Sequence, residues 1–239
     1  MFDALTKVGR RRRAARHLPD GPLRRYLQTP APAPGTSLTD LPLLAVDVET
    51  TGLEPGRDRL LSVGLVPVDG PRIDLSGADS VLVGADDDEG LTSRSGVVGQ
   101  SATLHGITDD ALAAGARPAD VLDRVFAALT GRVLLAHFSA LETGFLGDLC
   151  ARVHGVRPPF VTVDTLDMHL RVLTGGSDAD VTTGPMRGEV RLWAARERYG
   201  LPRYRAHDAL VDALACAELY LAQTAELADR GVSTLRDLR

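Results

Sequence analysis

Residues 41–53, with the sequence LPLLAVDVETTGL, decide the fold. The apolar first half, followed by turn-forming residues, predicts a buried β-strand. Strand side chains alternate between two faces, so we expect Asp47 and Glu49 on one face and Val46 and Val48 on the other. Neighbouring carboxylates repel each other, and Mg²⁺ or Mn²⁺ would relieve that repulsion. The stretch therefore predicts either a metal site or a solvated strand end.

The composition is that of a globular protein with unevenly distributed charge. Residues 1–29 carry a net charge of +6, which leaves −11 for the rest of the 239-residue chain. An acidic body argues against a large electrostatic footprint on nucleic acid. We find no membrane-spanning run and no secretory signal, so we expect a cytoplasmic protein with Cys150 and Cys216 as buried free thiols.

Composition shifts divide the chain into four expected parts. Residues 1–29 form a basic N-terminal arm, 30–40 a Pro-rich linker, 41–228 the main domain and 229–239 a C-terminal tail. The arm is expected either to bind nucleic acid or an acidic protein partner, or to remain a solvated terminus.

Within the main domain, hydrophobic spacing predicts three strands, followed by helices that alternate with two further strands and then by consecutive helices. The third strand is expected over 72–83, an acidic surface loop over 85–90 and a mobile loop over 174–188. The expected helices cover 118–129, 140–154, 164–172, 191–199 and 207–228, and the last two strands cover 132–136 and 160–163. This order predicts an α/β, three-layer fold with a mixed five-stranded sheet and helices on both faces.

Three more chemically active residues lie at element boundaries. His207 and Asp212 lie at the start of the last helix, whose alanines would let it pack closely on the sheet. An Asp on such a face is costly to bury unless it is paired or binds a metal. Glu142 lies in the first turn of the helix that follows a strand. For both acids, the alternative is stabilisation of a helix N-terminus.

Together these motifs resemble the DEDDh group of 3′–5′ exonucleases, in the ribonuclease H-like superfamily that includes the bacterial proofreading subunit. The first family motif matches residues 47–53. The second, usually His-Asn-x-x-Phe-Asp, corresponds to residues 137–142, with the sequence HFSALE. The third, His-x₄-Asp, matches His207 and Asp212. The resemblance covers about residues 41–223. Glu142 replaces the family Asp and Phe138 the family Asn, so rate or substrate preference is expected to differ.

The resemblance implies a set of roles for individual residues. Two divalent metal ions, Mg²⁺ or Mn²⁺, would be held by Asp47, Glu49, Glu142 and Asp212, with His207 as the general base. The terminal nucleotide would contact Thr50, Thr51, Gly52, Leu53, His105, His137 and Phe138. For Asp164, helix N-capping is preferred over metal binding.

The implied activity is removal of nucleotides from nucleic-acid 3′ ends, with single-stranded DNA favoured. An RNA or short-oligonucleotide exonuclease remains an alternative, because nothing in the residues discriminates a 2′-OH. Three further alternatives are a weakly active nucleic-acid-binding module, a polymerase-associated subunit, and an interaction subunit that docks through residues 1–29. Because the chain ends 27 residues after Asp212, a stand-alone repair or processing enzyme is expected.

Overall fold

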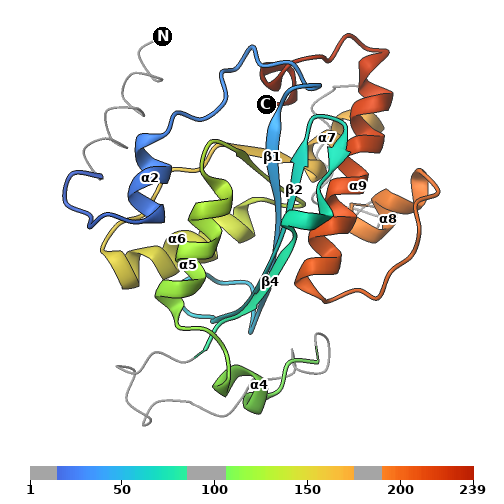
Figure 1. Cartoon of the computed structure of the whole chain (residues 1–239). Helices are drawn as coiled ribbons and strands as arrows, with labels where there is room; N and C mark the ends of the chain where they lie inside the picture. Colours follow the sequence, from blue (N-terminus) through green and yellow to red (C-terminus); the bar gives the residue numbers. More distant parts are fainter. Residues whose placement is uncertain (1–14, 85–105, 175–189) are drawn as a thin grey trace.

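The computed structural model describes residues 15–84, 106–174 and 190–239, and its centre is one mixed β-sheet (Figure 1). The strand order is β3-β2-β1-β5-β6, with β4 also paired to β2. The central strand β1 (Pro42–Thr50) is antiparallel to β2 (Leu60–Asp69) and parallel to β5 (Val133–Ala136). The last strand, β6 (Thr162–Asp164), is parallel to β5. The predicted mixed sheet is confirmed.

The predicted third strand is divided in two. Strands β3 (Arg72–Ile73) and β4 (Asp79–Leu82) both pair with β2 and are separated by the short helix η1 (Leu75–Gly77). The Asp74 carboxylate accepts hydrogen bonds from the backbone N–H and the hydroxyl of Ser76, which closes a local turn. The sheet therefore has six strands rather than the five predicted.

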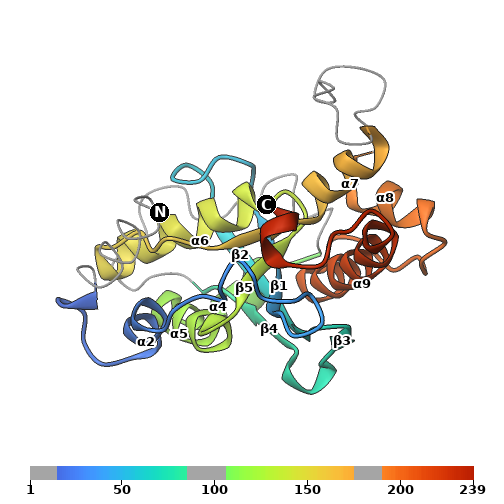
Figure 2. The same ribbon diagram turned by 90° about the horizontal axis from the view of Figure 1, so that it is seen from above.

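Helices cover both faces of this sheet (Figures 1 and 2). One face packs against α5 (Pro118–Leu129) and α6 (Ala140–His154), and the other against α7 (Thr165–Thr174) and α9 (Ala209–Ala228). Two shorter helices are α8 (Leu192–Arg198), which lies against α9, and α4 (Asp109–Ala113). The predicted three-layer α/β fold is confirmed.

The alternation predicted for β1 produces two separate cores. Leu44, Val46 and Val48 belong to the core on the α5 and α6 face. Leu43 and Ala45 belong to the core on the α9 face, which is the face that Asp47 and Glu49 share. The two acids therefore point toward the layer that contains α9.

Segments outside residues 41–228 also pack on the domain. Helix α2 (Pro22–Gln28) buries Leu23, Tyr26 and Leu27, and the Tyr26 and Phe126 ring centroids are 5.2 Å apart. These residues have the i, i+3, i+4 spacing of one helical face. At the other end, η4 (Leu235–Leu238) buries its two leucines, and the Leu235 N–H donates to the carbonyl oxygen of Thr36. The described part of the arm, the linker and the tail thus extend the core.

Helix boundaries agree closely with the sequence pattern. Helices α5 and α6 have the predicted bounds, whereas α9 begins at Ala209 rather than at residue 207. Both cysteines are buried free thiols, as expected. No helix in the described ranges combines the length and the apolar character needed to cross a membrane. The expected loops at 85–90 and 174–188 lie outside or almost wholly outside these ranges.

Candidate active site

Acidic side chains from three elements meet at the carboxyl-terminal part of β1. Ligand atoms of Glu49, His207 and Asp212 all lie within 4.8 Å of one another. Glu49 and Asp212 are each 8% exposed, and Glu142 at the start of α6 is 1% exposed. Asp47 interacts electrostatically with all three carboxylates. The structure therefore brings together the five residues predicted to be catalytic.

Gly64 allows α9 to reach this cluster. It lies opposite Asp47 in the β1–β2 ladder. A Cβ atom at this position would lie 2.1 Å from the carbonyl oxygen of Ala209, the first residue of α9. Only glycine permits such an approach, so the first turn of α9 places Asp212 beside β1. Gly64 is not among the predicted site residues, and the signal for it is a glycine within a largely apolar strand.

His207 lies just before α9 in a left-handed backbone conformation. Its φ angle is +66°, and its backbone N–H donates to Asp212 Oδ2 at 3.0 Å. Asp208 then caps α9, because its carboxylate accepts hydrogen bonds from the N–H groups of Leu210 and Val211. This cap explains why the helix starts two residues later than predicted, and the left-handed residue turns the imidazole toward the acids.

Arg196 anchors the loop that leads to His207. Its guanidinium is buried and donates to the carbonyl oxygens of Ala215 and Pro202 and to the Glu218 carboxylate. It also lies 5.1 Å from the Tyr204 ring centroid, a cation–π contact. One buried cation thus connects α8, the loop and α9. Arg196 is not among the predicted site residues, because its partners in α9 lie 19 and 22 residues away in the chain.

Asp164 organises the opposite side of the site. Its carboxylate accepts hydrogen bonds from the backbone N–H groups of Phe138 at 2.9 Å, Ser139 at 2.6 Å and Leu166 at 2.9 Å. The last bond confirms the predicted capping of α7. The first two hold the turn before α6, in which Phe138 has a φ angle of +74°. This turn directs Glu142 toward β1.

Burial and mutual repulsion perturb the acids. Burial, followed by the charges of Glu142, Asp212 and Glu49, raises the pKa of Asp47 well above its usual range. Burial and the charge of Asp212 raise the pKa of Glu49 to about 7. Burial is also the main cause that raises the pKa of Glu142, and it raises the pKa of Asp212 to about 6. The cluster therefore resists carrying its full negative charge without cations.

The donor atoms fit a divalent cation. Two buried carboxylate oxygens, Glu142 Oε2 and Asp212 Oδ1, have no hydrogen-bond partner among the described residues. Buried polar atoms are normally satisfied, so two unsatisfied acidic oxygens in one cluster suit an ion. The oxygen-rich donor set suits hard cations such as Mg²⁺ and Mn²⁺. The longer Glu142 side chain still belongs to the cluster, since its charge is, after burial, the largest cause of the raised pKa of Asp47.

The predicted nucleotide-binding residues on the β1–β2 hairpin have mixed surroundings. The Thr50 hydroxyl donates to the Gly52 carbonyl oxygen, and the Thr51 hydroxyl accepts from the Arg59 N–H. A Cβ atom at Gly52 would lie 2.4 Å from the Asp58 carboxylate, so this glycine permits a tight turn. Leu53 is 77% exposed and remains available for contact with a ligand.

The other three predicted contacts differ among themselves. Both ring nitrogens of His137 have protein partners, Thr165 Oγ1 at 2.9 Å and the Val190 carbonyl oxygen at 2.8 Å. This pairing favours a structural role for His137 over a nucleotide contact. Phe138 is 53% exposed. His105 lies outside the described residues.

Comparison with known proteins is consistent with this geometry. A family model described as an exonuclease matches residues 44–220. The DNA polymerase III subunit epsilon of Treponema pallidum (strain Nichols) is 27% identical over 181 residues, which are 76% of this chain and 75% of that protein.

Two solved structures show a similar fold. Escherichia coli exonuclease I in complex with a dT13 oligonucleotide has a TM-score of 0.62 at 18% identity, over 80% of this chain and 43% of that one. This chain thus spans less than half of exonuclease I. The nuclease domain of 3′hExo, a DEDDh family member bound to rAMP, has a TM-score of 0.59 at 17% identity, over 83% and 94% of the two chains.

The matched region contains β1 with its two acids, Glu142 and the His207–Asp212 motif. It therefore includes every residue of the acidic cluster, in the order that the DEDDh pattern requires. The chain belongs to the exonuclease family.

Proposed function

We propose that this exonuclease removes nucleotides from the 3′ ends of single-stranded DNA with the aid of two divalent metal ions. The observation that carries the proposal is the cluster of four buried or half-buried carboxylates, with two oxygens that lack a described hydrogen-bond partner. Such a cluster costs stability unless cations occupy it.

The residues divide the chemistry among themselves. Asp47, Glu49, Glu142 and Asp212 would hold the cations, Mg²⁺ or Mn²⁺. When bound, these cations would lower the pKa of an attacking water and offset the charge on the phosphodiester. His207, exposed beside Glu49 and Asp212, would accept the proton of that water.

The substrate end would lie against the β1–β2 hairpin. Leu53 and Phe138, four residues after Glu49 and four before Glu142, are large exposed apolar side chains, and apolar surfaces of this kind support nucleobases. The solved structures of similar fold include one with a DNA oligonucleotide and one with rAMP, so the experiment should compare DNA and RNA as substrates. The similarity to a polymerase subunit makes a polymerase partner a further outcome to examine.

End-labelled DNA and RNA strands provide the test. With Mn²⁺ or Mg²⁺, we expect stepwise shortening from the 3′ end of single-stranded DNA, and none with EDTA. Asp47→Asn and His207→Ala should each lower the rate by about 10²- to 10⁴-fold, because a charge ligand or the base is lost. Unchanged rates in both variants would contradict the assignment. Faster degradation of RNA would instead support the ribonuclease alternative.

A further inference from the structure

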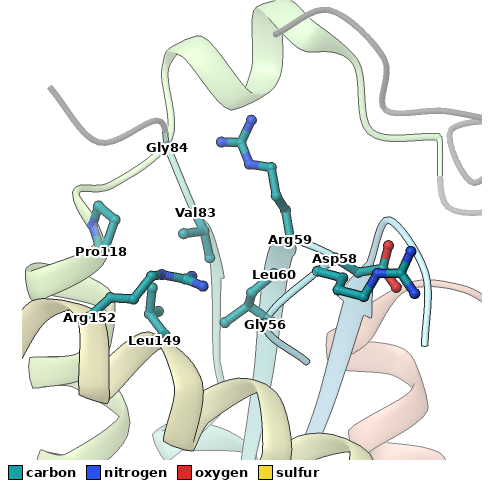
Figure 3. Close-up of a pocket in the computed structure, with 10 residues that line it drawn as sticks. Gly56, Asp58, Arg59, Leu60, Val83, Gly84, Pro118, Leu149 and Arg152 are labelled. Atoms are coloured by element: carbon teal, nitrogen blue, oxygen red, sulfur yellow. The ribbon is translucent and has the colours of Figure 1, made fainter. Parts of the chain in front are cut away.

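A small cavity with a basic rim lies beside the β1–β2 hairpin (Figure 3). Its volume is about 130 Å³. Buried apolar side chains, including Leu60, Val83 and Leu149, form its floor. Arg59 and Arg152 stand on either side of it, as Figure 3 shows. We name this cavity the Arg59–Arg152 pocket.

The pocket and the acidic cluster lie along the same helix. Glu142 is in the first turn of α6, and Arg152 follows ten residues later. At a rise of 1.5 Å per residue, the two positions are about 15 Å apart along the helix axis. The β1–β2 hairpin covers the interval, because Pro55 packs beside Gly144 and Gly56 lies beside Asp148. A strand that leaves the cluster over the exposed hairpin would therefore reach the pocket.

The charges at the pocket leave a cationic excess on its rim. The Arg59 guanidinium has no hydrogen bond or ion pair with any described residue. Arg152 shares a single carboxylate, that of Asp148, with Arg157. The Asp58 carboxylate accepts a hydrogen bond from the Glu54 N–H, and Figure 3 shows it directed away from Arg152. Guanidinium groups with unused donors bind phosphate oxygens well.

We propose that the Arg59–Arg152 pocket binds a backbone phosphate of the strand being degraded, on the 5′ side of the bond that is cut. This inference rests on the proposed function and adds a second contact point for the substrate. The contact is independent of base identity, because it reads only the phosphate. Strands that are long enough to reach the pocket should therefore bind more tightly than substrates that contact only the acidic cluster.

The test compares substrates of different length. Oligothymidylates of two to about twelve nucleotides would be compared with the p-nitrophenyl ester of thymidine 5′-phosphate, which is too short to reach the pocket. In wild type, KM should fall as length increases. Arg59→Gln should raise KM for the long strands by about fivefold and lower the salt slope by about one, whereas hydrolysis of the ester should continue. The KM of Arg59→Lys for long strands should lie between the values for the wild type and Arg59→Gln.

Arg230→Gln is the matched control. Arg230 is also partly exposed, but it pairs with Glu226 at the far end of α9. It should leave the length dependence unchanged. If Arg59→Gln and Arg152→Gln also leave it unchanged while the ester is cleaved, the pocket assignment is wrong and the proposed function stands. If the wild type cleaves neither ester nor strand, the proposed function itself fails.

Inorganic phosphate distinguishes the other source of the same chemistry. A pocket for free phosphate would make inorganic phosphate inhibit the wild type but not Arg59→Gln, with no dependence of KM on strand length. That result would overturn the proposal of a strand contact. If inorganic phosphate competes with long strands but not with the ester, and KM depends on strand length, the proposed strand contact is supported.

Discussion

Helix α6 carries two buried carboxylates that have opposite surroundings. Asp148 accepts ion-paired hydrogen bonds from both Arg152 and Arg157. Glu142, six residues earlier, has a buried oxygen with no partner among the described residues and faces other acids. A buried charge that is paired with arginines stabilises the architecture, whereas a buried charge among like charges indicates a functional site that suits a cation.

The two regions also differ in how they are assembled. Asp148 and its arginines lie within one short segment, residues 148–157. The acidic cluster draws on β1, α6 and the start of α9. Its geometry therefore depends on the packing of the whole domain, and its function should be more sensitive to substitutions that separate these elements.

The largest expected effect is on catalysis. Glu142→Gln should lower hydrolysis of the mononucleotide ester by about 10²-fold or more, because a neutral amide is a poorer ligand for a hard cation. Asp148→Asn should leave it within about twofold, since that acid only pairs with arginines. Steady-state rates of the folded variants measure both. Equal losses would contradict the comparison.

The next effect concerns stability and pH. The raised pKa values of Glu49, to about 7, and of Asp212, to about 6, mean that the folded chain keeps protons that the unfolded chain releases. Metal-free stability should therefore fall as the pH rises from about 4.5 to about 7, with Glu49 alone contributing about 3 kcal/mol.

Urea titrations at several pH values, with EDTA and then with Mn²⁺, measure this dependence. Mn²⁺ should restore stability at high pH, because it binds the ionised form. Glu142→Gln should weaken the pH dependence of the free energy of unfolding in the metal-free protein. Asp148→Asn should lower that free energy by about 1 kcal/mol at every pH. A metal-free protein that becomes more stable with rising pH over this range would rule out the assigned repulsion.

A smaller effect is expected from a change in packing alone. Gly64→Ala should cost about 1–3 kcal/mol and lower activity by about tenfold, because the added methyl group would displace α9 and Asp212. The Asp148 pairs would be unaffected. Gly21→Ala is the matched control, since nothing lies within 4 Å of a Cβ atom there. Thermal unfolding and ester hydrolysis report on both. Full activity in Gly64→Ala would disprove this role.

The smallest effect concerns the turn before α6. Phe138 has a left-handed backbone, which asparagine adopts more readily. Phe138→Asn should therefore raise the free energy of unfolding by about 0.5–1 kcal/mol, and Phe138→Leu should give no such gain. Chemical denaturation resolves the difference. A loss of stability in the asparagine variant would show that the aromatic ring contributes more than the backbone strain costs.

Local pattern accounts for most of the correct predictions. The bounds of α5 and α6 followed from apolar spacing, and the two faces of β1 followed from strand alternation. The divided third strand was missed because the turn at Asp74 depends on one side chain. The helix at residues 22–28 was missed because its apolar face acquires meaning only against Phe126 and α5.

The sequence was enough to single out the four acids and the histidine that the folded chain brings together, because each of the three motifs is a local pattern. It also determined the sheet and its layers, through hydrophobic periodicity. Only the tertiary structure decided how the residues meet. Gly64 admits α9 to the sheet, Arg196 anchors the loop before His207, and Asp164 holds the turn before Glu142. The pairs Gly64 and Ala209, Arg196 and Ala215, and Asp164 and Ser139 are each separated by 19 or more residues, and no local pattern records such contacts.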